Sequence, residues 1–280
     1  MRYKLTIEYD GKAFHGSQAQ AAARGRTVQG ELERALAQIT GGPIRIALAG
    51  RTDAGVHAQG QVASFALDPA WPRAKLQRAL NGVLPGDLAV RAIDRAGDDF
   101  HARYSATRRD YRYLIWESPV AAPLLRDRTW HVRAALDIAA MHEAAEALRG
   151  RHNFASFCGG GLGVPGSADD EAERPSTVRD MVNAACYVWP QASLYEAAPA
   201  PDGEGRLIAV DLAANAFLPQ MVRTIVGSLV AVGQGKWTPA AFVDVLERED
   251  RREAAATAPP QGLCLLRVWY ERDGPPKRNT

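Results

Sequence analysis

The stretch GRTDAGVHAQGQ, residues 50–61, surrounds a single acidic side chain with glycines and other small residues. It lies between two apolar runs, residues 44–49 and 62–67, and each run predicts a short strand. Asp53 is the only acid between Glu33 and Asp68. Glycines beside strand ends let a ligand approach the backbone closely. Asp53 is therefore either a turn residue that bonds its own backbone or a catalytic acid, base or nucleophile, and the segment alone favours the turn.

The elements around this stretch follow from hydrophobic periodicity. Apolar and polar residues alternate over 2–9, which predicts a half-buried strand, and Thr27 is a predicted N-cap for a helix that runs to residue 39. Further predicted strands cover 88–93, 109–116, 130–132, 178–189, 206–212 and 265–270. Further predicted helices cover 72–81, 137–148, 217–234 and 239–249, and 159–177 is a predicted loop. This order predicts an α+β protein with an N-terminal half (1–108), a C-terminal half (109–272) and a tail (273–280).

Arg223 is the only charged residue between Leu212 and Gly235. The predicted helix around it is apolar over most of its circumference, which is typical of a buried helix. A buried arginine needs an anionic partner because an unpaired buried charge is very costly. Gly227, one turn later, allows a close approach on the same face. We expect Asp53 to be the partner of Arg223, and a structural ion pair elsewhere is the alternative.

A third candidate feature is Arg108-Arg109-Asp110-Tyr111-Arg112-Tyr113. On a strand, Tyr111 and Tyr113 share one face and arginines flank them. Arginines interleaved with aromatic rings suit stacking on a base beside a phosphate. An ordinary edge strand of alternating charge explains the pattern equally well.

Composition narrows the class of protein. The chain has 280 residues, of which 46% are hydrophobic and 24% charged, values typical of a globular protein. The sequence has no membrane-length apolar run and no signal core at its start, so we expect a soluble protein of the cytoplasm. Three separated cysteines and six histidines show no metal-ligand spacing, and we predict no metal. Residues 1–110 carry 16 Lys and Arg against 11 Asp and Glu, so this half is the better candidate for an anionic partner.

Taken together, these residues resemble the TruA-type tRNA pseudouridine synthases. The resemblance spans nearly the whole chain in the correct order, and GRTDAGVH is its most specific motif. The matching motifs are Tyr9-Asp10-Gly11, Thr27-Val28-Gln29-Gly30, residues 50–65, Phe100-His101-Ala102-Arg103, Tyr111-Arg112-Tyr113, Asn153-Phe154, Met221-Val222-Arg223 and Gly262-Leu263. The resemblance implies two RRM-like α+β halves whose sheets join across a central catalytic cleft.

The resemblance also implies the activity and the site. It implies that a homodimer isomerises uridine to pseudouridine in the tRNA anticodon stem-loop, at positions 38, 39 and 40, without a cofactor. Asp53 matches the essential aspartate and nucleophile, Arg223 its salt-bridge partner, and Tyr111 the tyrosine that stacks on the uracil. Arg51 matches a residue that contacts the displaced nucleotide. Arg24, Arg26, Arg109 and His57 are further candidates for RNA contacts.

Two positions depart from the family pattern. Ser17 follows Phe14-His15-Gly16 where the family usually has an aromatic residue, and Pro219-Gln220 stand where basic or histidine residues are frequent. Both departures concern the grip on RNA and leave Asp53, Tyr111 and Arg223 in place. The main alternative function is a non-catalytic RNA-binding protein or tRNA chaperone. A third hypothesis, an aspartate-nucleophile hydrolase or phosphotransferase, is disfavoured because the sequence shows no metal site and no phosphate cradle.

Overall fold

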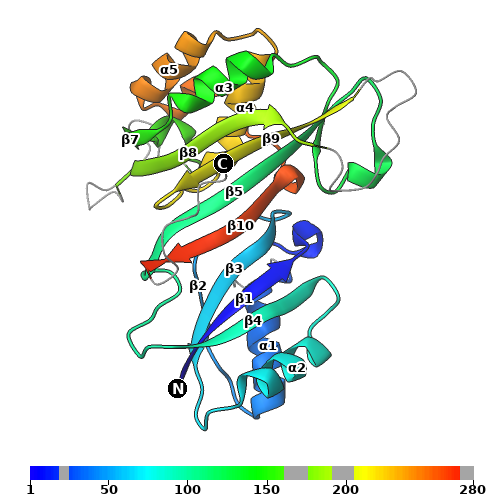
Figure 1. Ribbon diagram of the computed structural model, residues 1–280, viewed down its shortest axis with the longest axis vertical. Coiled ribbons are helices and arrows are strands. Elements are labelled where there is room, and N and C mark those ends of the chain that lie inside the picture. Colours follow the sequence, from blue (N-terminus) through cyan, green and yellow to red (C-terminus); the bar gives the residue numbers. More distant parts are fainter. Residues whose placement is uncertain (19–24, 161–175, 191–204, 272–280) are drawn as a thin grey trace. The chain divides into compact units, whose positions relative to one another are not determined.

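The structure is a computed structural model that describes residues 1–18, 25–160, 176–190 and 205–271 (Figure 1). Within these ranges the chain forms ten β-strands and five α-helices. Its contacts divide it into two compact units. Unit 1 contains residues 1–109 and the segment that begins at Cys264, and unit 2 contains residues 110–263. Most of the predicted loop 159–177 lies outside the described residues.

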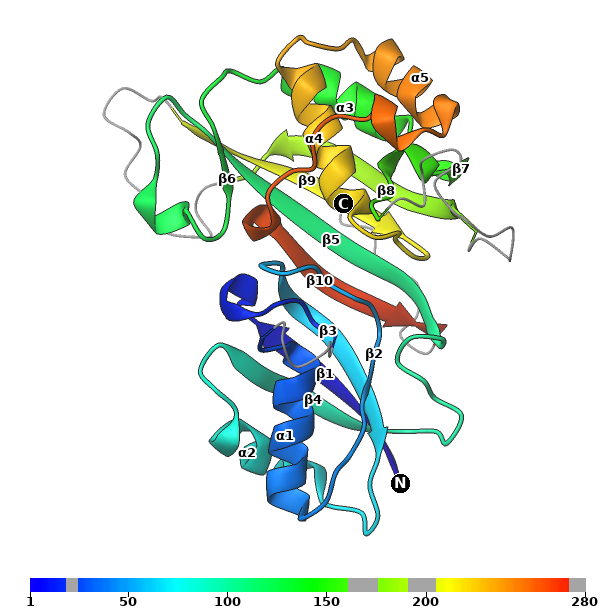
Figure 2. The same cartoon turned by 180° about the vertical axis from the view of Figure 1, so that it is seen from behind.

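Unit 1 is a sheet with two helices on one face (Figures 1 and 2). In sheet order its strands are β4 (Leu88–Ala96), β1 (Arg2–Tyr9), β3 (His57–Ala66) and β10 (Leu263–Tyr270), and the short β2 (Ala47–Leu48) also pairs with β3. Strand β1 is antiparallel to both β3 and β4, whereas β10 runs parallel to β3. The helices are α1 (Val28–Thr40) and α2 (Arg73–Val83).

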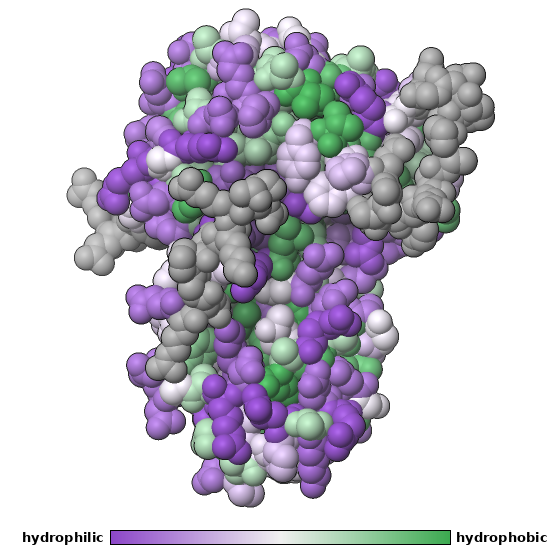
Figure 3. Space-filling view, in the orientation of Figure 1, coloured by the Kyte–Doolittle hydropathy of each residue, from purple (hydrophilic) through white to green (hydrophobic). Residues whose placement is uncertain are grey.

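The alternation along β1 explains the core of unit 1. Tyr3, Leu5, Ile7 and Tyr9 are all buried. The buried apolar residues of the two helices are Val28, Leu32, Ala35 and Leu36 in α1 and Leu76 and Leu80 in α2. Thr27 caps α1 as predicted, since its side chain accepts a hydrogen bond from Gly30 N. The face of unit 1 seen in Figure 3 mixes hydrophilic side chains with smaller hydrophobic patches, which fits a sheet whose core lies on the helix side.

Unit 2 repeats the combination of strands and helices. Its strands follow the order β5 (Ala106–Glu117), β9 (Arg206–Ala214), β8 (Val178–Val188) and β7 (Gly150–Asn153), and β6 (Trp130–Val132) pairs in parallel with β5. Helix α3 (Ile138–Glu146) packs on β8 and contacts α4 (Met221–Gly233) and α5 (Pro239–Arg248). The three helices lie together on one side of β8 and β9 (Figure 2).

Several elements differ from the sequence-based expectation, and two of the differences have a local reason. Strand β3 begins at His57, inside the glycine-rich stretch, because Gly60 lets the neighbouring strand approach: a Cβ there would lie 2.4 Å from Leu266 O. Helix α4 begins at Met221 rather than residue 217, since Gln220 takes the left-handed conformation (φ 57°). The predicted strand 44–49 shortens to β2.

Two further features of the described chain bear on function. No helix in the described ranges is both long and apolar enough to cross a membrane. In the same ranges no group of three or more histidine, cysteine, aspartate or glutamate side chains has the arrangement of a metal site.

Candidate active site

Asp53 lies in the loop that joins β2 to β3 in unit 1. Its backbone forms a tight turn, because Val56 N donates to Asp53 O at 3.2 Å and Gly55 takes a φ of 81°. The Asp53 side chain is half-buried, whereas Thr52 before it and Val56 after it are buried. The two interpretations of this aspartate are thus compatible: the backbone turns at Asp53, and the carboxylate stands between two anchored neighbours.

The N-terminal segment 9–17 anchors the far side of this turn. Gly11 N donates to His57 Nδ1 at 3.0 Å, and Gly55 N donates to Phe14 O. A Cβ on Gly11 would lie 2.0 Å from Val56 O, so only glycine fits this close backbone contact. His57, predicted to contact RNA, is only 3% exposed and is occupied by this hydrogen bond.

Of the arginines predicted for RNA contacts, Arg51 is exposed beside the turn and Arg109 is buried. The Arg109 guanidinium donates to three backbone carbonyls, those of Ala49, Arg103 and Ala106, at 2.9 to 3.0 Å. Ala49 lies between β2 and the loop that carries Asp53. The hydrogen bond from Arg109 to Ala49 O therefore fixes the start of that loop. Arg24 lies outside the described residues.

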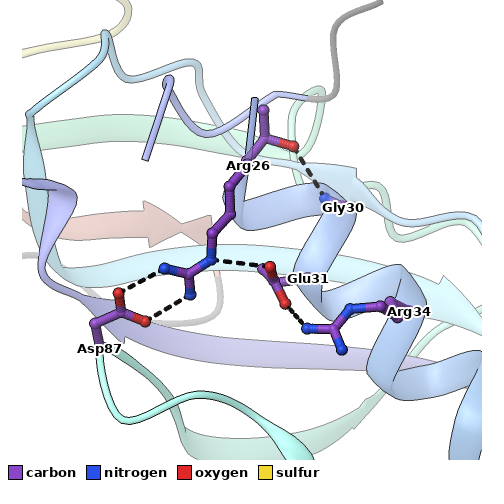
Figure 4. Close-up of polar contacts among 6 residues, drawn as sticks. Arg26, Gly30, Glu31, Arg34 and Asp87 are labelled. Carbon is purple, nitrogen blue, oxygen red and sulfur yellow. Dashed lines mark hydrogen bonds and ion pairs between the residues drawn. The ribbon is translucent and has the colours of Figure 1, made fainter. Parts of the chain in front are cut away.

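Arg26 is held by two carboxylates of unit 1 (Figure 4). Its guanidinium donates to both oxygens of Asp87, at 2.8 and 2.9 Å, and its Nε donates to Glu31 at 2.9 Å. Glu31 also binds Arg34. Hydrogen bonds from Arg26 hold the pKa of the Asp87 carboxyl below its usual range. Arg26 also stacks on Phe14, with 4.5 Å from its guanidinium carbon to the ring centre.

In unit 2, Tyr111 occupies β5 with its ring packed edge-on against Phe217, 5.1 Å between ring centres. The side chain is 7% exposed. Phe217 belongs to the segment that the sequence predicted as the first turn of a helix, whereas it precedes α4. Phe217 therefore contacts the Tyr111 ring from the segment between β9 and α4.

Sequence reasoning missed the pair that anchors β5. Arg112 donates from Nε and Nη2 to the two carboxylate oxygens of Asp211 on β9, each at 2.7 Å, and its guanidinium lies 3.8 Å from the Trp189 ring centre. Tyr187 OH donates to the same carboxylate, and burial raises the pKa of that phenol to about 12. The detectable signal was Asp211 itself, the one acid in the apolar run of β9. This pair fixes the strand that carries Tyr111.

Arg223 lies near the start of α4, and the helix around it is buried as predicted. Its Nε donates to Ala258 O at 2.7 Å, and Ala258 N donates to Arg223 O at 3.0 Å. The close approach predicted at Gly227 comes from the chain itself, because a Cβ there would lie 1.9 Å from Ala256 O. The segment 256–258 therefore orients Arg223. Arg223 belongs to unit 2 and Asp53 to unit 1, and their pairing stays a prediction.

The sequence profile of the tRNA pseudouridine synthase family matches residues 5–105 and 144–271. The chain belongs to this family. Among its relatives are two proteins named tRNA pseudouridine synthase A: the one from Roseiflexus sp. is 44% identical over 273 residues (96% of this chain, 91% of the relative), and the one from Chloroflexus aurantiacus is 45% identical over 266 residues (95% and 87%). A third, from Ruminiclostridium cellulolyticum, is 38% identical over 269 residues (96% and 99%).

Family membership confirms the predicted resemblance, the α+β pseudouridine synthase fold and the enzyme class, an isomerase that forms pseudouridine in tRNA. Asp53 and Arg223 lie within the matched segments of this tRNA pseudouridine synthase family member, whereas Tyr111 lies in the interval between them. The alignments with the relatives above span 95% or more of the chain.

In this family member, the backbone that carries the Asp53 carboxylate is held by hydrogen bonds on both sides. Asp53 sits on a backbone whose turn is fixed at Val56 and whose preceding strand is fixed by Arg109. On such a rigid support a carboxylate is already positioned to act as nucleophile or base, so little conformational entropy is lost when it reacts.

Proposed function

We propose that the chain isomerises uridine to pseudouridine in the anticodon stem-loop of tRNA, with Asp53 as the nucleophile. The observation that carries the proposal is the fixed turn around Asp53, whose flanking residues are buried and whose close backbone contact with Gly11 tolerates no side chain. Asp53 is also the one acid in a long stretch of the sequence that the family profile matches.

In the proposed reaction the N1–C1′ bond of uridine breaks, the uracil turns, and C5 bonds to C1′. The C5 proton leaves and N1 gains a proton, so atoms and electrons balance within the nucleotide and the proposal requires no oxidant, reductant or cofactor. Asp53 attacks C1′ or uracil C6, and its action as the base that takes the C5 proton is the remaining route. Tyr111 stacks on the detached ring, and Arg223 stabilises the ionised Asp53.

The remaining candidates divide by their surroundings. Arg51 is exposed beside the turn, and this exposure supports its proposed contact with the displaced nucleotide. His57 and Arg109 are buried and engaged with backbone atoms, and Arg26 is engaged with Asp87 and Glu31. We therefore infer that these three hold the Asp53 region in shape, in place of the direct RNA contacts expected from the sequence.

Two features of the proposal rest on the family resemblance. A homodimer that grips one tRNA across both subunits is proposed, and sedimentation velocity at micromolar protein would reveal a monomer if it is wrong. Because tRNA is the substrate, the proposed site of action is the cytoplasm.

The deciding experiment uses an unmodified tRNA transcript and maps pseudouridine by carbodiimide adducts and primer extension. The wild-type protein should give new stops in the anticodon arm, whereas Asp53→Ala should give none while binding tRNA with near wild-type affinity. Asp98→Ala, which makes the same change at an exposed acid after β4, is the matched control and should retain full activity. Full activity of Asp53→Ala would refute the role of Asp53, and binding without stops in the wild type would favour the non-catalytic RNA-binding protein.

A further inference from the structure

Ser17 is fully buried, although it follows a loop glycine. It makes two hydrogen bonds to the backbone of Thr52, the residue directly before Asp53. Ser17 Oγ accepts from Thr52 N at 2.8 Å, and Ser17 N donates to Thr52 O at 3.1 Å. A single serine thus satisfies both backbone polar groups of Thr52.

The side chain of Thr52 is held from a second direction. Thr52 Oγ1 and Tyr9 OH form a hydrogen bond of 2.9 Å, and the Tyr9 side chain is 3% exposed. Burial raises the pKa of Tyr9 to about 12, so the phenol keeps its proton throughout the physiological range. All three polar groups of Thr52 (N, O and Oγ1) are therefore bonded within unit 1.

Ser17 is itself attached to a rigid element. Its carbonyl oxygen accepts from Gln29 N at 2.9 Å, and the Gly16 carbonyl oxygen accepts from Val28 N. These two N–H groups belong to the first turn of α1, where no helical partner exists for them. The chain of contacts runs from the start of α1 through Ser17 to Thr52, and ends one residue before Asp53.

We propose that Ser17 is a positioning residue for Asp53, acting with Tyr9 through Thr52. This inference rests on the proposed role of Asp53. A carboxylate that must meet C1′ or C6 of a turned uracil tolerates little displacement, because misplacement by about 1 Å can cost a reaction roughly 100-fold. Ser17 fixes the backbone that carries this carboxylate from thirty-five positions away in the sequence.

Ser64 provides a matched control within unit 1. Its Oγ accepts from Ala102 N at 3.0 Å, and its side chain is 2% exposed. Ser17→Ala and Ser64→Ala therefore make the same chemical change: each removes a buried hydroxyl and leaves one buried backbone N–H without its acceptor. A purely structural role for Ser17 predicts equal consequences for the two variants.

The test measures single-turnover pseudouridine formation at saturating protein, the tRNA dissociation constant and the thermal midpoint for each variant. We expect Ser17→Ala to slow the single-turnover rate about 10- to 100-fold with tRNA affinity within about twofold. Ser64→Ala should lower the thermal midpoint by a similar amount and leave the rate within about twofold. Tyr9→Phe, which removes one oxygen and keeps the ring, should also slow the rate, and it serves as the test if Ser17→Ala does not fold.

Equal rates for Ser17→Ala and Ser64→Ala, or a loss in Ser17→Ala that lies wholly in tRNA affinity, would overturn the inference. Asp53→Asn in the same assay separates it from the proposed function. If Asp53→Asn retains the wild-type rate, the role of Asp53 fails. If Asp53→Asn is inactive while Ser17→Ala and Tyr9→Phe match Ser64→Ala, only the positioning role fails.

Discussion

At the scale of single residues, charged side chains in unit 1 serve two purposes that the sequence does not distinguish. Arg26 and Arg51 were both expected to touch RNA. Arg26 instead binds Asp87 and Glu31, whereas Arg51 is exposed. The difference arises because Asp87 follows α2, far from Arg26 in the sequence. No local sequence pattern predicts an ion pair between two residues so far apart.

The Arg26–Asp87 pair predicts a pH dependence of stability. Arg26 lowers the pKa of Asp87 in the folded protein, so the pair stabilises the fold fully above the ordinary carboxyl pKa and loses this contribution as pH falls through the lowered value. Asp87→Asn should lower the thermal midpoint at pH 7 by a few degrees, consistent with about 1 kcal/mol for a bidentate pair. The gap between wild type and variant should narrow below about pH 4 in thermal melts.

Asp94→Asn is the control for that pair. Asp94 meets Arg73 at 3.5 Å, and both side chains are more than half exposed. The change should alter stability by less than about 0.5 kcal/mol at any pH. A gap for Asp87→Asn that stays constant from pH 7 to pH 3 would show that the ion pair is not its cause.

At the scale of elements, the close packing of a neighbouring segment against α4 orients the side chain of Arg223. Residues 256–258 cross α4 at Gly227, and this contact sets the Ala258 carbonyl that receives the Arg223 guanidinium. A glycine inside a helix ordinarily destabilises it by about 0.5–1 kcal/mol relative to alanine. The helix retains Gly227 because any side chain would displace the crossing segment.

Gly227→Ala should therefore reverse the usual sign of a glycine-to-alanine change. Because the new Cβ meets a backbone oxygen, we expect a destabilisation of about 1–3 kcal/mol and a slower pseudouridine formation as Ala258 shifts. Gly82→Ala in α2 is the control, since a Cβ there meets nothing within 4 Å, and it should leave the thermal midpoint unchanged or raise it. Equal thermal midpoints for the two variants would contradict this account.

Periodicity predicted most of the helices and strands with the correct type, because long alternating or amphipathic runs are local signals. It missed β7, whose four residues, Gly150–Asn153, show no alternation of apolar side chains. The sequence pattern singled out Asp53 as the only acid in a long stretch, and Arg223 as the only charged residue in an apolar helix. It did not reveal the bonds between Ser17 and Thr52, since nothing in the residues around Ser17 indicates a partner so distant in sequence.

At the scale of the whole molecule, the small net charge of +2 conceals an excess of basic over acidic residues in 1–110. Several of those arginines are neutralised by carboxylates within unit 1, as Arg26 and Arg45 are. The number of cations available to phosphates is therefore smaller than the sequence suggests, and binding to tRNA should depend on a few exposed arginines.

Arg51→Ala should test this dependence through salt. We expect weaker tRNA binding and a plot of log affinity against log salt whose slope is shallower by about 1, because one phosphate contact is lost. Arg45→Ala removes an exposed arginine that pairs with Glu33, and it should leave the slope nearly unchanged. The slopes are measured by tRNA titrations from about 50 to 200 mM salt. If both variants flatten the slope equally, the overall electrostatic attraction of the protein outweighs a specific contact at Arg51.

Strand β10 pairs with β3 in unit 1 but follows all of unit 2 along the chain. The ribosome therefore synthesises all of residues 110–263 before it synthesises β10, the strand that pairs with β3. The strands and helices of unit 2 can pack together during synthesis. In contrast, the edge of β3 at His57 and Ala58 stays unpaired until Cys264 and Leu265 emerge and pair with it. During translation, the neighbourhood of Asp53 is thus among the last parts of the protein to be completed.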